Sequence, residues 1–183
     1  MTKIADVGLR FANPTYEITM HYRRAFTPGG TFFFTLVTQA RQPVFASAEA
    51  VDSLRNAFRV VRASRSFRID AMVVMPDHLH CLWTLPPGDA DFSTRWRLIK
   101  TWFTKHHAAK ERVWQARYWE HQIRDDADFA NHVDYIHYNP VKHGLAASPK
   151  AWPYSSFRRH VDAGVYPANW GESAMEFKGI GQE

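Results

Sequence analysis

The sequence has a single cysteine, Cys81, so it cannot form an intrachain disulfide framework. It also has no internal repeat, no low-complexity tract, and no apolar run long enough for a signal peptide or a membrane span. These features argue against a disulfide-stabilised secreted scaffold, a repeat array and a membrane protein. Since 183 residues with 45% hydrophobic content suffice for one ordinary domain, we expect one globular unit in the reducing cytoplasm.

Positive charge is in excess, with 23 Lys and Arg against 18 Asp and Glu and a pI near 9.5. This balance favours an anionic partner, and nucleic acid is the leading candidate. The chain also holds 10 His, 7 Trp, 7 Tyr and 13 Phe. Aromatic rings beside cations can stack on unpaired bases, although most of these rings are expected in the core.

Hydrophobic patterns predict seven elements of secondary structure. Strands are expected at 31–38, 67–75 and 78–85, the last two paired as a hairpin, with a weaker fourth strand at 119–124. Helices are expected at 48–63, at 92–109, and from Asp125 or Asp126 to Pro140. This order is typical of an α+β fold with an antiparallel sheet, of ferredoxin-like (RRM-like) type. The residues after Ser148 are expected to wrap the surface without regular structure.

Two histidines flank a leucine in the third predicted strand, at His78-Leu79-His80. Side chains two residues apart on a strand point to the same face, so the two imidazoles can hold one metal ion. Leu79 and Cys81 would then face the packed side. The pattern is short enough to arise by chance, and a metal site needs at least one more ligand.

A tyrosine and an amide, Tyr135 and Asn139, lie four residues apart in the third predicted helix. If Val133 and Ile136 form the apolar stripe, Tyr135 falls on roughly the opposite side and points away from the core. The hydroxyl can then attack a substrate, and the amide oxygen can complete a metal shell. The alternative is that these tyrosines only pack at a domain edge, which we favour for Tyr138.

Residues 95–117 hold seven basic residues, one acidic residue and three tryptophans. Cations beside flat rings suit phosphate contacts and base stacking. A solvated charged face over buried tryptophans is the competing interpretation. The basic residues expected to bind DNA, in this stretch and elsewhere, are Arg23, Arg24, Arg95, Lys100, Lys105, Arg117 and Lys142.

Three segments taken together resemble the REP-associated tyrosine transposases, relatives of the single-strand insertion-sequence transposases in the HUH single-tyrosine class. The segments are MPDHLHCLW, DYIHYNPVKHG, and an early stretch with Tyr22-Arg23-Arg24, Pro28-Gly29-Gly30 and Phe33-Phe34-Thr35. The resemblance runs from about Tyr22 to about Tyr166, and its specificity lies in the order and spacing of the motifs. We accordingly expect an N-terminal extension at 1–21, a transposase domain at 22–148 and a C-terminal tail at 149–183.

The resemblance implies an HUH palm in which His78, His80 and Asn139 hold Mg²⁺ or Mn²⁺ and Tyr135 is the nucleophile. It implies a cytoplasmic, nucleoid-associated substrate, the single-stranded hairpins of repetitive extragenic palindromes (REPs), and a monomer or homodimer. Attack by Tyr135 would give a 5′-phosphotyrosine and a free 3′-hydroxyl, and strands could then be joined without ATP. Two other functions stay open: a non-catalytic nucleic-acid-binding module, and a metal-dependent hydrolase whose nucleophile is water.

Overall fold

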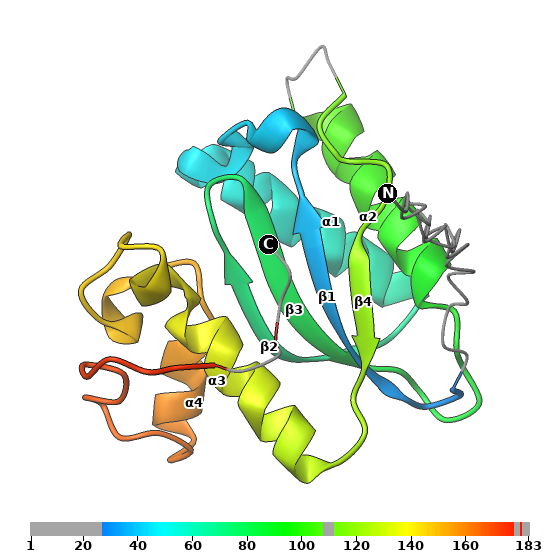
Figure 1. Ribbon diagram of the computed structural model, residues 1–183. Helices are drawn as coiled ribbons and strands as arrows, with labels where there is room; N and C mark the ends of the chain where they lie inside the picture. Colours follow the sequence, from blue (N-terminus) through cyan, green and yellow to red (C-terminus); the bar gives the residue numbers. More distant parts are fainter. Residues whose placement is uncertain (1–26, 108–111, 178–179, 181–183) are drawn as a thin grey trace, which may run out of the picture.

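The computed structural model describes residues 27–107, 112–177 and 180, and its centre is a four-stranded antiparallel sheet (Figure 1). The strands lie in the order β2-β3-β1-β4. Their bounds are Thr31–Val37 for β1, Arg68–Val74 for β2, His78–Thr84 for β3 and Trp119–Gln122 for β4. None of the helices in these residues is long and apolar enough to cross a membrane.

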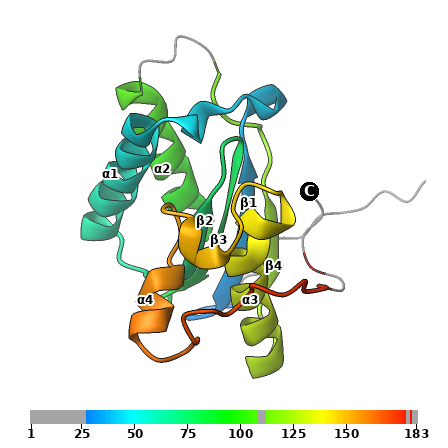
Figure 2. The ribbon, with the colours of Figure 1, turned by 90° about the vertical axis from the view of Figure 1, so that its left-hand side faces the viewer.

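Helices cover both faces of the sheet (Figures 1 and 2). Helices α1 (Ala48–Ser64) and α2 (Phe92–His106) lie on one face, and α3 (Asp126–Lys142) lies on the other, with the short α4 (Phe157–Asp162) beside it. Each long helix begins at a capping side chain that accepts a hydrogen bond from a first-turn backbone N–H: Ser47 for α1, Asp91 for α2 and Asp125 for α3. The predicted α+β fold with an antiparallel sheet is confirmed.

Alternation along the strands divides the interior into two apolar layers. In β3, Leu79, Cys81 and Trp83 pack toward α1 and α2. The indole of Trp83 stacks on that of Trp96 in α2, with ring centroids 4.2 Å apart. Leu82 belongs to the opposite layer, beneath α3. The side chains of β3 at even positions, the two histidines included, therefore face α3.

The C-terminal part of the chain is more ordered than the sequence suggests. We expected no regular structure after Ser148, which is wrong, because a 3₁₀ turn at Pro149–Ala151 and helix α4 lie there. The backbone of Val74 donates to the carbonyl of Tyr154, and that of Ser156 donates to the carbonyl of Met72, each at 2.8 Å. This segment therefore covers the outer edge of β2. Its apolar side chains Phe157 and Tyr166 are buried against α3, which is the physical reason for the order.

Candidate active site

The predicted histidine pair and the predicted tyrosine meet where α3 crosses β3. The rings of His78 and His80 lie 4.9 Å apart, and the ring of Tyr135 lies 5.3 Å from that of His80. Phe33 of β1 packs against both His80 and Tyr135, at 5.5 Å and 6.1 Å between ring centroids. Strand and helix are thus packed so that the tyrosine faces the histidines.

The two imidazoles are held by hydrogen bonds through the same nitrogen. His78 Nδ1 donates to the Asp77 carboxylate at 2.6 Å, and His80 Nδ1 lies 2.9 Å from the Thr35 hydroxyl. A histidine that binds a metal usually has its other ring nitrogen in such a bond, which orients the ring. Both Nε2 atoms are buried, so they are the nitrogens that would coordinate an ion inside this layer.

Asn139 occupies the position on α3 that faces the same two rings. Tyr135, Asn139 and His143 are spaced four residues apart and share one side of the helix. Tyr135 contacts His80 at one end of this row, and His143 lies 5.3 Å from the ring of His78 at the other. Asn139 is fully buried, and so is its Oδ1 atom. Two imidazole nitrogens and one amide oxygen form a donor set that fits a divalent cation with positions left for phosphate oxygens.

The position of Tyr135 opposite Val133 and Ile136 predicted that its side chain points away from the core. In the structure it does not. Its side chain is only 1% exposed, and Val133 and Ile136 are buried in the same apolar layer. The reason is that α3 is enclosed on two sides, by the sheet and by the C-terminal residues 149–177. Phe177 of that segment meets the ring of Tyr135 edge-on at 5.7 Å.

Lys142 is a charged residue that contacts the tyrosine. Its ammonium donates to the Tyr135 hydroxyl at 3.3 Å and lies 4.9 Å from the centre of the ring. The sequence analysis placed Lys142 among the DNA-binding residues and did not connect it with Tyr135. Their separation of seven residues, which is two helical turns, could have indicated that the two side chains lie on the same side of the helix.

For Tyr138 we expected only packing at a domain edge, and the structure shows it packed against C-terminal residues. Its ring meets those of Trp170 and Phe177, and its hydroxyl accepts a hydrogen bond from the backbone of Met175 at 3.3 Å. Its ring and its hydroxyl are therefore both engaged by C-terminal residues.

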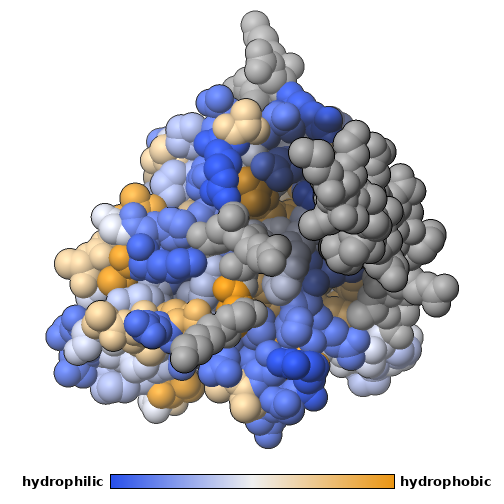
Figure 3. All heavy atoms as spheres, in the orientation of Figure 1, coloured by the Kyte–Doolittle hydropathy of each residue, from blue (hydrophilic) through white to orange (hydrophobic). Residues whose placement is uncertain are grey.

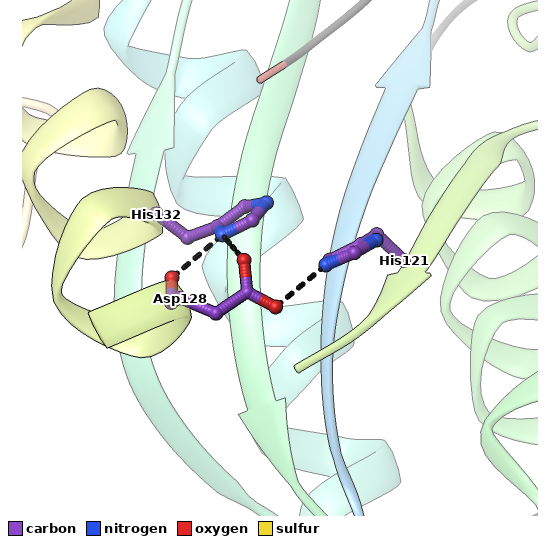
Figure 4. Close-up of side chains that lie close together, drawn as sticks. All are labelled: His121, Asp128 and His132. Carbon is purple, nitrogen blue, oxygen red and sulfur yellow. Dashed lines mark hydrogen bonds and ion pairs between the residues drawn. The ribbon is translucent and has the colours of Figure 1, made fainter. Parts of the chain in front are cut away.

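A second group of metal-type donors lies at the start of α3 (Figure 4). Ligand atoms of His121 in β4 and of Asp128 and His132 in α3 lie within 4.8 Å of one another. Asp128 accepts hydrogen bonds from His121 Nε2 at 2.9 Å and from the Arg124 guanidinium at 3.0 Å, and it lies 3.2 Å from His132 Nδ1. The sequence analysis gave these residues no role, although the spacing of Asp128 and His132 was visible.

These neighbours stabilise the ionised form of the Asp128 carboxylate. Burial acts to raise the pKa of Asp128, but hydrogen bonds from Arg124 and His121 outweigh it and hold the pKa well below its usual range. Burial lowers the pKa of His132. The surrounding surface is hydrophilic, because Arg124, Asp125 and Asp126 are exposed at the start of α3 (Figure 3).

The predicted DNA-binding residues differ in where they lie and in how exposed they are. Arg23 and Arg24 lie outside the described residues. Arg95 is only 2% exposed, and its guanidinium is held by the Asp89 carboxylate at 2.7 Å and 3.1 Å and by the backbone carbonyl of Ser66 at 2.8 Å. Its assignment to DNA binding is wrong, because a buried cation with these partners serves the fold.

The other four cations remain within reach of solvent. Lys100 is half-buried and donates to the carbonyl of Gln115 at 2.8 Å; burial lowers its pKa, and the charge of Arg112 lowers it further. Lys105, Arg117 and Lys142 are exposed.

Comparisons with known proteins agree with this geometry. The family model described as "Transposase IS200 like" matches residues 30–139, a span that includes both histidines, Tyr135 and Asn139. A REP-associated tyrosine transposase of Escherichia coli K12 is 46% identical over 156 residues, which is 85% of this chain and 93% of the relative. A solved structure of a REP-associated tyrosine transposase bound to a REP hairpin superimposes with a TM-score of 0.80 and 44% identity, covering 88% of this chain and 97% of that one. The chain therefore belongs to the IS200-like transposase family, a class of enzymes.

Proposed function

We propose that this chain cleaves and rejoins single-stranded DNA at the foot of REP-like palindromic hairpins, with Tyr135 as the nucleophile. The observation that carries the proposal is the packing of Tyr135 against His80, on the one face of α3 that also bears Asn139. The similar structure that holds a REP hairpin supports the substrate class. All the proposed site residues belong to one chain, an arrangement that a monomer and a homodimer can both use.

The covalent step follows from the residues around the phenol. The oxygen of Tyr135 attacks a phosphorus of the DNA, a tyrosyl P–O bond forms, and the bond from phosphorus to the 3′ oxygen breaks. The phenol gives up its proton, and the departing 3′ oxygen takes one up. The ammonium of Lys142, 3.3 Å from the phenol oxygen, stabilises the negative charge that develops on it. Because one phosphodiester bond replaces another, a 3′-hydroxyl can reverse the step without ATP.

His78, His80 and Asn139 would hold the metal ion, which we propose to be Mg²⁺ or Mn²⁺. When bound, such an ion draws charge from the phosphate oxygens and orients them. The contribution of this chain is to fix the donors: Asp77 and Thr35 set the two rings, and α3 carries the amide. The burial of all three donor atoms fits a site from which water is largely excluded.

The second donor group, His121, Asp128 and His132, is proposed as a hydrogen-bond network that anchors α3 on β4. Asp128 already accepts from the backbone and the guanidinium of Arg124, each at 3.0 Å. A guanidinium at this distance opposes the approach of a divalent cation.

The test is incubation of the full chain with a labelled REP hairpin that has single-stranded flanks, in Mn²⁺, followed by a denaturing gel. A protein–DNA adduct that survives denaturation, together with a shortened strand, is the expected result. Cleavage without an adduct would favour the hydrolase, and binding without cleavage would favour the non-catalytic module.

A further inference from the structure

A cavity of about 340 Å³ lies at the outer edge of β2, between that strand, helix α1 and the C-terminal segment 154–159. Figure 2 looks onto this edge, with α1 on one side of the sheet and α3 on the other. The segment forms the wall by hydrogen-bonding to β2 through Tyr154 and Ser156, so the cavity exists only in the folded full chain. Its volume is at the small end of the about 300–1,000 Å³ typical of ligand sites.

Four arginines line this cavity, which makes it suitable for an anion: Arg55, Arg62, Arg68 and Arg159. Arg55 and Arg68 each have a carboxylate partner, Asp52 and Asp70. Arg62 and Arg159 donate to backbone carbonyls, of Phe67 for the first and of Ile69 and Asp70 for the second. In the described part of the chain neither of these two forms an ion pair, so the cavity carries net positive charge. Guanidinium groups of this kind recognise phosphate.

The remaining lining suits a flat ring. Tyr154 contributes an aromatic side chain, and the guanidinium of Arg55 lies 5.7 Å from its centre. Val51 of α1 and Met72 of β2 supply aliphatic surface. Any of the four bases can stack on such a tyrosine, because every base has a π face.

The cavity lies near the proposed active site. Met72 and Val74 of β2 line it, and Val73 between them pairs with His80 of β3 in the sheet register. Ser156, which lines the cavity, lies 2.8 Å from His137 of α3 through its hydroxyl and the ring Nε2. The cavity is thus one strand away from the histidines and shares contacts with the helix that carries Tyr135.

We propose that this cavity binds one nucleotide of the single strand that flanks the hairpin, with the base on Tyr154 and a phosphate on Arg62 and Arg159. The inference rests on the proposed function in taking flanked hairpin DNA as the substrate. The same chemistry would also admit a free nucleotide, so the test must separate the two sources.

The experiment compares dissociation constants by fluorescence anisotropy, without divalent metal so that no cleavage occurs. The probes are a REP hairpin with single-stranded flanks and the same hairpin without them. Tyr154→Leu and Arg62→Gln should each weaken binding of the flanked hairpin roughly tenfold and leave the flank-free hairpin unchanged. Tyr154→Phe, which keeps the ring, should bind both probes like the wild type.

Equal losses on both probes, or no loss on either, would overturn the proposal. So would calorimetry in which deoxyadenosine monophosphate alone binds the wild type as tightly as the flanked hairpin does, because the cavity would then serve a free nucleotide. Should a variant unfold, 2-aminopurine placed at each flanking position of DNA bound to the wild type gives a second reading: one position should be quenched by stacking, and quenching at none would contradict the assignment. Failure of this proposal leaves adduct formation by Tyr135 intact, whereas failure of the proposed Tyr135 chemistry abolishes the adduct and leaves these binding constants unaffected.

Discussion

Thr35 and His80 face each other across the two central strands, and the Thr35 hydroxyl lies 2.9 Å from His80 Nδ1. This short side chain determines which nitrogen of His80 is directed to the proposed metal position. A threonine thus orients a proposed metal ligand through one hydrogen bond.

Replacing Thr35 with valine keeps the side-chain shape and removes the hydroxyl. We expect the Mn²⁺ concentration needed for half-maximal cleavage to rise about 10–100-fold, since loss of such a partner weakens metal binding by this factor. Thr31→Val is the matched control, because Thr31 makes a similar bond at 2.8 Å to Thr84, across the same two strands but away from the histidines. An unchanged Mn²⁺ requirement in Thr35→Val would contradict the assignment.

Tyr135→Phe removes the phenol oxygen and keeps the buried ring against His80 and Phe33. Hairpin binding and the melting temperature should persist, and the covalent adduct should vanish from a denaturing gel. Tyr138→Phe removes only a hydroxyl that accepts from Met175, so it should retain the adduct. Loss of the adduct in Tyr138→Phe alone would identify Tyr138, one helical turn further along α3, as the nucleophile.

His78→Asn or His80→Asn should abolish cleavage, and chelation of the metal should mimic both. Both rings are buried beneath α3, so these changes should also lower the melting temperature. His121→Asn tests the alternative donor group: it should reduce stability and leave the Mn²⁺ dependence of cleavage unchanged. A chelator-resistant reaction would exclude the metal role of the pair.

The ionised carboxylate of Asp128 should stabilise the folded protein at neutral pH and lose this effect in acid. Its folded pKa lies well below the value of about 3.9 in unfolded chains, so the ionised carboxylate stabilises the fold fully above about pH 5. Asp128→Asn should lower the free energy of unfolding at pH 7 by about 1–3 kcal/mol. The difference from wild type should shrink as the pH falls from 5 toward 2. Urea unfolding of the wild type and the variant at several pH values measures this difference.

DNA binding should prefer a hairpin with single-stranded flanks over duplex DNA of the same sequence, and it should weaken steeply with salt. Lys105→Glu and Arg117→Glu, at exposed positions, should each weaken binding and reduce the slope of log affinity against log salt by about one. Arg95→Met should instead lower the melting temperature, because it leaves Asp89 without its buried partner. Equal binding of duplex DNA would argue against single-strand recognition.

Much of the fold could be predicted because its signals are local. Alternation in the predicted strand 78–85 correctly separated the histidines from Leu79 and Cys81, and the cap expected at Asp125 or Asp126 located the start of α3. The antiparallel sheet followed from the order of the elements.

The errors concern long-range contacts. The orientation of Tyr135 depends on a C-terminal segment some 40 residues away, which buries the side of α3 that an amphipathic helix would expose. Arg95 looked like part of a basic surface because charge counts carry no information on burial, and its partner Asp89 lies in a loop. Helical periodicity cannot show either fact.

The strand order also affects how the protein is made. Strand β1 is the first described strand to leave the ribosome, yet its neighbours are β3 and β4, which are translated much later. At about 5–20 residues per second, the apolar segment Thr31–Val37 waits several seconds for β4, with unpaired backbone groups along its length. The pairing of β1 on both sides is therefore completed only after β4 has been made. Tyr135 follows all four strands in the chain, so the proposed nucleophile is synthesised only after the last strand of the sheet that supports it.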